Sequence, residues 1–537
     1  MARRSDQLAL SLVVGAVSAL VTAAATTGVA LLLEREPPRP ALVPRAAAPS
    51  PPTAPTTAPS HARNVLLLVW DTARADRMSL YGHHRPTTPQ LDAWAANAAV
   101  WTHAISPSFW TVPAHASLFT GLAVRSHGCD AADPWLRDDR ETLAEWLGAH
   151  GWTTWGFTAN PNIGPATNLA QGFDTLIGLD IPPWAERAQA LAMQRQLPED
   201  ASHARGPAWS GPRDDAVLGK DVGPLAAEAL ADFLRDRQDG RPFFAFVNLM
   251  EAHTRRTPTR SSREAIGLTP AEIALGLKTN ADFDQLKRAN RAEVTYTDAE
   301  IEAMRGVYDA TLRDLDDATA AVFAALAAAG HADDTVIVLV SDHGDQIGEG
   351  GLYGHNWSVS EALVHVPLVI RAPDLPPGRR DAPVSTADVF GTIAALAGAP
   401  VPGASTLLAP RSPVVTQLTA PHGVRPGAPE RAPDGSYLPH RRRFDALYDG
   451  RWKLTTSSAG ETWLFDLESD PTESRDRAAA ELERVQAMIA ALDAWRNQTP
   501  LPADGPLPRA ERQRRKDVQE AANGESREPL RALGYVQ

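Results

Sequence analysis

Two long apolar runs dominate the hydrophobic pattern of the chain, and each is followed by an acidic residue. Residues 64–70 (Asn-Val-Leu-Leu-Leu-Val-Trp) precede Asp71, and residues 335–341 (Thr-Val-Ile-Val-Leu-Val-Ser) precede Asp342 and His343. Runs of this length predict strands that are buried on both faces, as in a parallel sheet. Open α/β sheets bind ligands at the carboxyl ends of their strands, so these polar residues are expected at one edge. A single aspartate could merely begin a turn, but its recurrence favours a shared site.

Helical and strand-like patterns alternate in the region around these two runs. This alternation predicts an α/β fold with a mostly parallel sheet and helices on both of its faces. The polar residues 254–298 lack strand signals, and we expect them to form an insertion near the ligand edge that acts as a substrate-shaping lid. The expected segments are, in chain order, a helix at 141–150, a strand at 152–157, a helix at 225–237, a strand at 243–250, a helix at 300–329 and a strand at 366–370.

The N-terminal part of the chain differs in character from this α/β region. Residues 1–36 include an uncharged apolar run at 8–33, which predicts a membrane anchor or a signal sequence. Arg3 and Arg4 before the run favour a cytoplasmic N-terminus, and therefore a catalytic domain that is periplasmic or extracellular. Residues 37–62 are rich in Pro, Ala and Thr, which predicts a semi-rigid spacer.

We expect the rest of the chain to form an α/β domain over residues 63–400, a C-terminal subdomain over 401–498 and a charged, proline-containing tail over 499–537. Within the subdomain, short alternating patterns predict a small antiparallel sheet, followed by a helix. The expected strands are residues 444–448, 452–456 and 462–467, and the expected helix is residues 478–497.

Residues 108–121 (Ser-Phe-Trp-Thr-Val-Pro-Ala-His-Ala-Ser-Leu-Phe-Thr-Gly) combine a hydroxyl group with start and stop signals of a helix. Thr111 suits the N-cap, Pro113 the first turn, and Gly121 the left-handed position after the helix. An anionic ester at such a helix start would meet unpaired backbone N–H groups and the positive end of the helix dipole. His115 lies one turn further on the same face. These features fit an active-site helix, and they also fit an ordinary capped helix.

Charge and cysteine content narrow the function classes. The 537 residues carry a formal net charge of −13, which disfavours a nucleic-acid partner because such partners require a basic surface. Cys129 is the only cysteine in the sequence, and this excludes an internal disulfide framework and a cysteine metal cluster. An anionic substrate would therefore need a local positive site.

Four motifs follow one another as Asn-Val-Leu-Leu-Leu-Val-Trp-Asp, Thr-Thr-Pro-Gln-Leu-Asp, Pro-Ala-His-Ala-Ser-Leu-Phe-Thr-Gly and Val-Ser-Asp-His-Gly-Asp. Together they resemble the sulfatase family of the alkaline phosphatase superfamily, over about residues 62–480. The resemblance implies an alkaline-phosphatase-like fold in which Asp71, Asp342 and His343 bind one divalent metal ion. It also implies that Thr111 occupies the nucleophile position and contributes to the metal site. Mn²⁺ or Zn²⁺ suits these oxygen and nitrogen ligands, and Mg²⁺ or Ca²⁺ is the alternative.

Three further histidines are candidates for catalysis or substrate binding. His355 and His115 are expected to bind the non-bridging oxygens of the ester. His253 is expected to contact the same oxygens or to protonate the leaving group. Each could instead be a buried structural histidine, and the order of the family motifs favours a functional role most for His355.

The chain also departs from the family pattern. Formylglycine sulfatases oxidise a Cys or Ser within Cys/Ser-x-Pro-x-Arg, whereas residues 111–115 read Thr-Val-Pro-Ala-His and cannot give that aldehyde. Thr72 stands where sulfatases commonly carry a second acidic ligand. Arg313 stands where two-zinc relatives place a histidine, one helical turn after Asp309. We therefore expect one metal ion, and a phosphate ester rather than a sulfate ester as the better substrate.

The favoured function is a metal-dependent hydrolase of a phosphate or sulfate ester that acts through Thr111. Threonine nucleophiles with one metal resemble phosphoethanolamine transferases and lipoteichoic-acid synthases, so a membrane-anchored transferase of a phosphoethanolamine or glycerophosphate group is an alternative. A degenerate binding protein is a third reading, and the retained Asp71, Asp342 and His343 speak against it. An anionic envelope lipid or glycan is the kind of substrate that the expected location favours.

Overall fold

The computed structural model describes residues 58–59, 61–179, 183–194, 220, 222–421, 441–502 and 507–524. All of them belong to one compact unit, Pro49–Gln537. The predicted anchor or signal at residues 1–36 lies outside the described residues. Within the described residues, none of the helices combines the length and the apolar character that a bilayer crossing requires.

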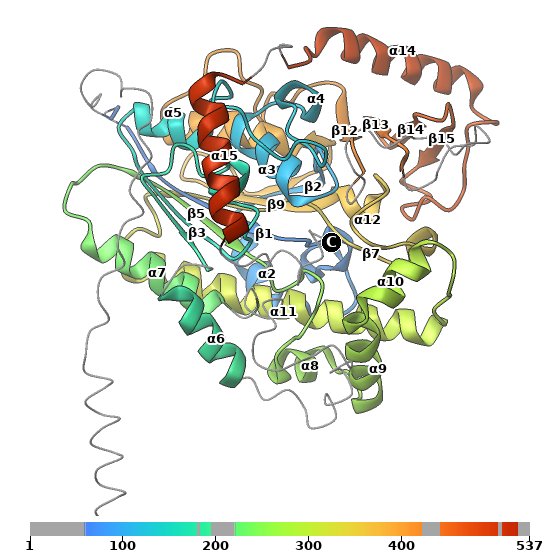
Figure 1. Ribbon diagram of the computed structural model, residues 1–537, viewed down its shortest axis with the longest axis horizontal. Coiled ribbons are helices and arrows are strands. Elements are labelled where there is room, and N and C mark those ends of the chain that lie inside the picture. The colour runs from blue at the N-terminus through green and yellow to red at the C-terminus, as the bar shows by residue number, and fades with distance from the viewer. Residues whose placement is uncertain are drawn as a thin grey trace, which may run out of the picture. The chain divides into compact units, whose positions relative to one another are not determined.

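A central sheet organises the described residues. Its strands are β1 (Asn64–Trp70), β2 (Ala99–Ile105), β3 (Thr153–Thr158), β4 (Thr175–Gly178), β5 (Phe243–Leu249), β6 (Thr335–Ser341), β9 (His365–Arg371), β10 (Gly378–Arg380) and β11 (Val384–Ser385). They lie in the order β10-β2-β9-β6-β1-β5-β3-β4, and β11 also pairs with β2 (Figure 1). Strand β9 runs antiparallel to β2 and β6, while the other pairs are parallel. The predicted mostly parallel sheet is confirmed.

Strand β1 shows why the central strands are apolar throughout. Its alternate side chains from Val65 to Val69 pack into one core, and those from Leu66 to Trp70 pack into another on the opposite face. All of them are fully buried, so β1 lacks the polar alternation of a strand with one wet face. The covering helices are α3 (Thr111–Thr120), α5 (Leu143–Ala149) and α13 (Val389–Ala397) on the first face, and α6 (Trp184–Gln194), α7 (Gly223–Asp236) and α11 (Asp298–Ala328) on the second.

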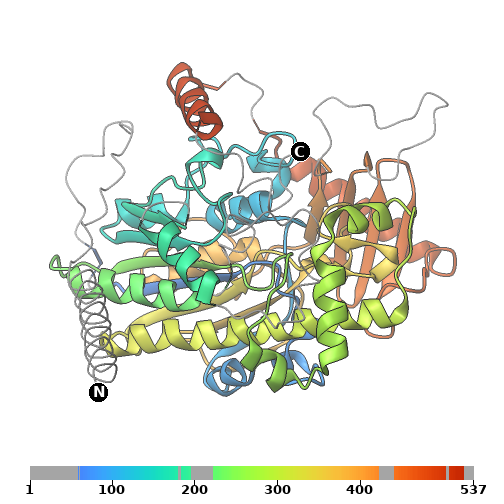
Figure 2. The same cartoon turned by 60° about the horizontal axis from the view of Figure 1, so that its bottom comes forward.

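Helix α11 is the longest of these, and Figure 2 shows it running along one side of the sheet. It begins at Asp298 because Thr297 and Glu300 form a capping box, in which each side chain satisfies the backbone N–H of the other residue. The helix predicted for residues 300–329 is thus confirmed, with a start two residues earlier.

The predicted insertion at residues 254–298 is helical. It contains α8 (Arg260–Ile266), α9 (Pro270–Ala281) and α10 (Phe283–Asn290), and no strand. Asn290 at the end of α10 donates to the carbonyl oxygen of Tyr353 at 2.8 Å and accepts from the Tyr353 N–H at 2.7 Å. This pair joins the insertion to the hairpin of β7 (Gln346–Ile347) and β8 (Tyr353–Gly354), which directly precedes His355. Its action as a lid remains a prediction.

The C-terminal antiparallel sheet has the order β12-β13-β14-β15. The three predicted strands are β13 (Phe444–Asp449), β14 (Trp452–Ser457) and β15 (Thr462–Asp466), and β12 (Val414–Leu418) adds an edge strand that the sequence pattern did not indicate. Helix α14 (Leu482–Gln498) packs on this sheet through Met488 and Leu492. The predicted tail contains a further helix, α15 (Arg509–Gly524).

A buried lysine fastens the C-terminal sheet to the α/β region. Lys453 on β14 donates to the carbonyl oxygen of Val359 at 2.6 Å, and its ammonium lies 2.9 Å from Glu361 and 2.8 Å from Glu473. The Lys453 side chain is fully buried. Glu361 begins α12 (Glu361–Val364), shortly after His355, so this contact fixes a segment next to a predicted site residue.

Replacing Lys453 by methionine should destabilise the protein by about 3–5 kcal/mol, because two buried carboxylates would lose their counter-charge. Urea unfolding of the full chain measures this change. Adding Glu361→Gln and Glu473→Gln to Lys453→Met should restore part of the loss, since the uncompensated charges are then removed. An unfolding midpoint that Lys453→Met leaves unchanged would show that the ion cluster does not stabilise the fold.

Candidate active site

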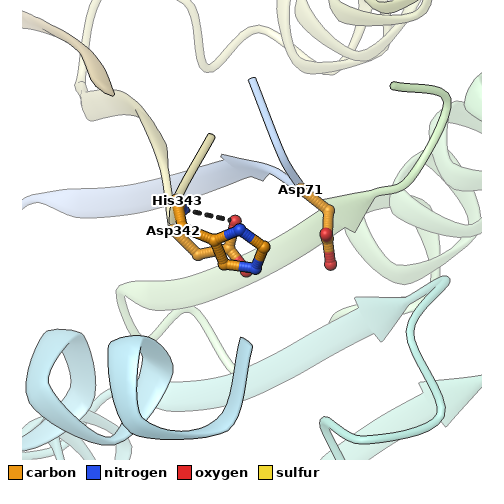
Figure 3. Close-up of side chains that lie close together, drawn as sticks. All are labelled: Asp71, Asp342 and His343. Carbon is orange, nitrogen blue, oxygen red and sulfur yellow. Dashed lines mark hydrogen bonds and ion pairs between the residues drawn. The ribbon is translucent and has the colours of Figure 1, made fainter. Parts of the chain in front are cut away.

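The polar residues that follow the two apolar strands β1 and β6 lie close together at one edge of the sheet. Strands β1 and β6 are parallel neighbours, and Trp70 pairs with Ser341, so Asp71 and Asp342 leave the sheet side by side. One ligand atom from each of Asp71, Asp342 and His343 lies within 4.8 Å of the others, and all three residues are buried. Figure 3 shows the two carboxylates and the imidazole drawn together, with the His343 backbone N–H donating to Asp342 Oδ1 at 2.7 Å.

These donors fit a divalent cation. Asp71 Oδ1 and Asp342 Oδ2 are buried and accept no hydrogen bond from the described residues. Burial, and for Asp71 the nearby charge of Asp342, raise the pKa of each carboxyl to about 7, so the pair lacks sufficient positive charge from the protein. His343 Nδ1 donates to the carbonyl oxygen of Gly344 at 2.8 Å, which leaves the lone pair on Nε2 for a metal ion. Two carboxylates and one imidazole suit Mn²⁺ or Zn²⁺, and also admit Mg²⁺ or Ca²⁺.

Thr111 lies at the start of α3 beside this cluster. Its Oγ1 is 3.4 Å from His343 Nε2. The prediction that Thr111 is the N-cap is wrong by one residue: Trp110 is extended and takes that position, and Thr111 is the first helical residue. The Trp110 side chain makes no capping bond to the helix. The predicted helix end is confirmed, because Gly121 has a φ of 70°.

His115 lies against the cluster from within α3. Its Nδ1 donates to the carbonyl oxygen of Thr111 at 2.9 Å and is 3.5 Å from Asp342 Oδ2. The ring meets Phe119 and Phe246 edge to face. Burial lowers the pKa of His115 to about 3, so the imidazole is neutral. The neutral His115 ring therefore lies beside Asp342 without bonding to it, while oxygen binding by His115 remains a prediction.

The other two predicted histidines flank the cluster. The His355 ring is centred 4.6 Å from that of His343 and 5.1 Å from that of His253. Burial alone would lower the pKa of His355, but its hydrogen bond to Asp345 at 3.0 Å and the nearby carboxylates raise it above the usual value. His253 donates from Nδ1 to the carbonyl oxygen of Thr254 at 2.6 Å, and burial holds its pKa well below the usual value. Of the two, His355 is the better proton donor.

Sequence reasoning missed one residue that touches both Asp71 and Thr111. Asn160 follows β3, and its Nδ2 donates to Asp71 Oδ2 at 2.7 Å and to Thr111 Oγ1 at 3.3 Å. Asn160 is fully buried, and its backbone N–H donates to Asn248 Oδ1 at 3.1 Å. A polar side chain three residues beyond the strand predicted for residues 152–157 was the signal that could have pointed to it.

Two of the departures from the family pattern, at Thr72 and next to Asp309, concern metal ligands, and the structure shows what these residues contact. Thr72 has a φ of 62°, its backbone N–H donates to Asp342 Oδ1 at 3.2 Å, and its hydroxyl donates to the carbonyl oxygen of Asp71. The proton of the Thr72 hydroxyl is therefore engaged in a hydrogen bond to the backbone. Asp309 on α11 accepts hydrogen bonds from Arg77 and Arg85, each with a contact of 2.8 Å. Its carboxylate is held by guanidinium groups, and the single metal ion remains a prediction.

Sequence comparison identifies relatives of the whole α/β region. The family model described as Sulfatase matches residues 63–399. The choline-sulfatase of Rhizobium meliloti (strain 1021) is 29% identical over 288 residues, which are 52% of this chain and 54% of that protein. The chain thus spans about half the length of that relative. The multifunctional alkaline phosphatase superfamily protein PehA of Trinickia caryophylli is 26% identical over 58% of this chain and 68% of that protein.

Solved structures agree with the fold. The phosphonate monoester hydrolase of Agrobacterium radiobacter superposes with a TM-score of 0.64, at 21% sequence identity, over 82% of this chain and 96% of that chain. Its likeness concerns the architecture: a mainly parallel sheet between helices, with a separate small antiparallel sheet. Family model, ordered motifs and architecture coincide, and the chain belongs to the sulfatase family with its alkaline-phosphatase-like fold.

Proposed function

We propose that this protein hydrolyses an anionic ester through Thr111, with one divalent metal ion held by Asp71, Asp342 and His343. The observation that carries the proposal is the contact of the Thr111 hydroxyl with a buried cluster whose two carboxylates each keep an unbonded oxygen. The names of the relatives, a choline-sulfatase and a multifunctional alkaline phosphatase superfamily protein, support an ester hydrolase.

A metal ion at this cluster would lower the pKa of the Thr111 hydroxyl and neutralise charge on the transferred group. Asn160 donates to Thr111 Oγ1 and so orients it. In the first step, the Thr111 hydroxyl releases its proton to solvent, and Oγ1 bonds to the central atom of the ester while the bond to the leaving oxygen breaks. His355, whose pKa is raised by its hydrogen bond to Asp345, supplies the proton that the leaving oxygen needs. Water then attacks the same central atom, and one of its protons passes to the His355 imidazole. The bond to Oγ1 breaks, and Thr111 regains its proton from solvent.

Phosphate-type esters should be turned over faster than sulfate esters. A formylglycine hydrate can release sulfate by collapsing to an aldehyde, whereas a threonine ester must be attacked a second time at its central atom. A metal ion and positioned donors can assist both attacks when that atom is phosphorus. The test is a panel of aryl sulfate, phosphate monoester, phosphodiester and phosphonate esters with the purified, metal-loaded full chain. Efficient hydrolysis of the aryl sulfate alone would contradict the proposal, and transfer to an added alcohol would favour the transferase alternative.

His355→Ala should slow esters with poor leaving groups more than esters with good ones. General acid catalysis contributes about 10²–10⁴-fold, and it matters most when the leaving oxygen is basic. Measuring kcat across aryl esters of graded phenol pKa separates this role from simple binding. His253→Ala is the matched comparison and should show a weaker dependence on the leaving group. An equal loss across the series for His355→Ala would assign His355 to binding the non-bridging oxygens.

We also place the α/β region outside the cytoplasm, on the basis of the apolar run at residues 8–33 and the preceding Arg3 and Arg4. An anionic envelope lipid or glycan is then the substrate class to test first. A reporter that works only outside the cytoplasm, fused after Gln537, should be active. Activity confined to the cytoplasm would contradict this orientation.

A further inference from the structure

Helix α15 is docked on the loop that precedes α5. Glu511 is almost fully buried, and its Oε1 accepts the indole N–H of Trp135 at 3.0 Å and the backbone N–H of Asp138 at 3.1 Å. The guanidinium of Arg514 pairs with Asp138, and it also lies over the Trp135 ring with that of Arg515. A charged helix within the predicted tail is therefore held by a buried carboxylate and an aromatic side chain.

The same loop holds the segment that follows Asn160. Asn168 is in the left-handed conformation and donates from Nδ2 to Asp138 Oδ1 at 2.9 Å and to the carbonyl oxygen of Leu136 at 2.6 Å. The Leu136 N–H in turn donates to the carbonyl oxygen of Thr167 at 2.9 Å. Asp138 is thus bonded both to Arg514 of α15 and to Asn168, while its neighbour Leu136 bonds to Thr167.

From there the contacts continue to the candidate active site. Thr167 Oγ1 donates to the carbonyl oxygen of Asn162 at 2.6 Å, and the Asn162 N–H donates to Asn160 Oδ1 at 2.9 Å. The other end of the same Asn160 amide donates to Asp71 and Thr111. Because Oδ1 is held by Asn162, the orientation of the amide is set by the loop, and the donors point at the proposed nucleophile.

We infer that helix α15 is a positioning element of the active site: through Trp135, Asp138 and Asn168 it holds the 160–168 loop, which we term the Asn160 loop, so that the Asn160 amide orients Thr111 and Asp71. Glu511 is its central positioning residue, although it touches no reacting atom. The kinetic part of this inference rests on the proposed function. The structural part, that docking of α15 orders the Asn160 loop, does not.

The test compares three variants of the full chain. Glu511→Ala removes the acceptor of Trp135 and Asp138, Glu511→Gln keeps an acceptor oxygen at the same place, and Arg512→Ala alters an exposed side chain on the same helix. Hydrogen exchange should rise in residues 509–519 and in residues 158–168 for Glu511→Ala, stay near wild type for Arg512→Ala, and largely recover for Glu511→Gln. Thermal unfolding verifies that each variant folds.

On the best ester of the panel, Glu511→Ala should lower kcat by about 10- to 100-fold, with KM changed by less than about threefold, because a small displacement of a positioned group costs rate more than binding. Faster exchange in residues 509–519 with unchanged exchange in residues 158–168 would overturn the inference, whatever the activity. If Glu511→Ala leaves hydrogen exchange in residues 509–519 unchanged, the double variant Glu511→Ala, Arg514→Ala should raise it. If neither variant raises exchange there, these contacts do not dock α15, and the inference is overturned. A chain that hydrolyses no ester but shows the coupled exchange would refute the proposed function and keep the coupling.

Discussion

Thr111→Ala should lower kcat for the best ester by about 10⁴-fold or more, as removal of other covalent nucleophiles does. The hydroxyl touches His343 and Asn160, and alanine would leave the cluster without an attacking atom. Thr111→Ser is the matched control: it keeps the oxygen and should retain most of the activity. Thermal unfolding of both variants verifies that the fold tolerates the changes.

A second measurement detects the covalent step directly. Rapid acid quenching of the wild-type chain during turnover of a phosphate ester, followed by mass spectrometry, should place a phosphoryl group on the peptide that contains Thr111. Thr111→Ala should carry none. If Thr111→Ala kept most of the activity, the nucleophile would have to be sought elsewhere, with a metal-bound water as the first alternative.

Asp342→Asn should have opposite effects on the metal-free and metal-loaded chain. Without metal, the charge of Asp342 raises the pKa of the buried Asp71 carboxyl, so the neutral amide should raise the unfolding temperature. With metal, the variant loses a charged ligand, and its affinity for Mn²⁺ or Zn²⁺ should fall by more than about 100-fold, since even outer partners are worth about 10–100-fold. Ester hydrolysis by Asp342→Asn should fall as well, because less of the chain then holds the metal ion.

Calorimetric titration and thermal unfolding with and without metal measure both effects. Asp333→Asn is the control, because that carboxylate is exposed and remote from the cluster. A metal-free Asp342→Asn chain that is less stable than the metal-free wild type would show that the carboxylate pair is not repulsive. An unchanged metal affinity would remove Asp342 from the ligand set.

The parts of the fold that could be predicted from the sequence are those in which one residue type repeats over a whole element. Strands β1 and β6 are apolar along their full length because both faces are covered, so their ends, and with them Asp71 and Asp342, were easy to find. Strand β2 contains a partly exposed Thr102 and an exposed His103, which interrupt its apolar pattern, and it was not predicted. Its place is set by pairing with β9, which no local pattern reveals.

The candidate site divides in the same way. Asp71, Asp342, His343 and Thr111 lie in segments with strong local signals, and the structure brings them together. Asn160 lies in a loop, and it reaches Thr111 only because β3 and β5 are parallel neighbours that place its backbone beside Asn248. The docking of Glu511 on Trp135 joins residues 376 positions apart, a separation at which sequence periodicity carries no information.

The ion cluster around Lys453 has a consequence for how the protein is made. Glu361 leaves the ribosome well before Lys453 does. For some time, therefore, the nascent chain carries the Glu361 carboxylate without the lysine that neutralises it in the folded protein. During that interval, burying the unpaired carboxylate would cost free energy, so the segment should stay exposed to water. Folding of the segment around His355 should therefore wait for synthesis of the C-terminal sheet, and a stalled chain that ends near residue 440 should bind chaperones and lack activity.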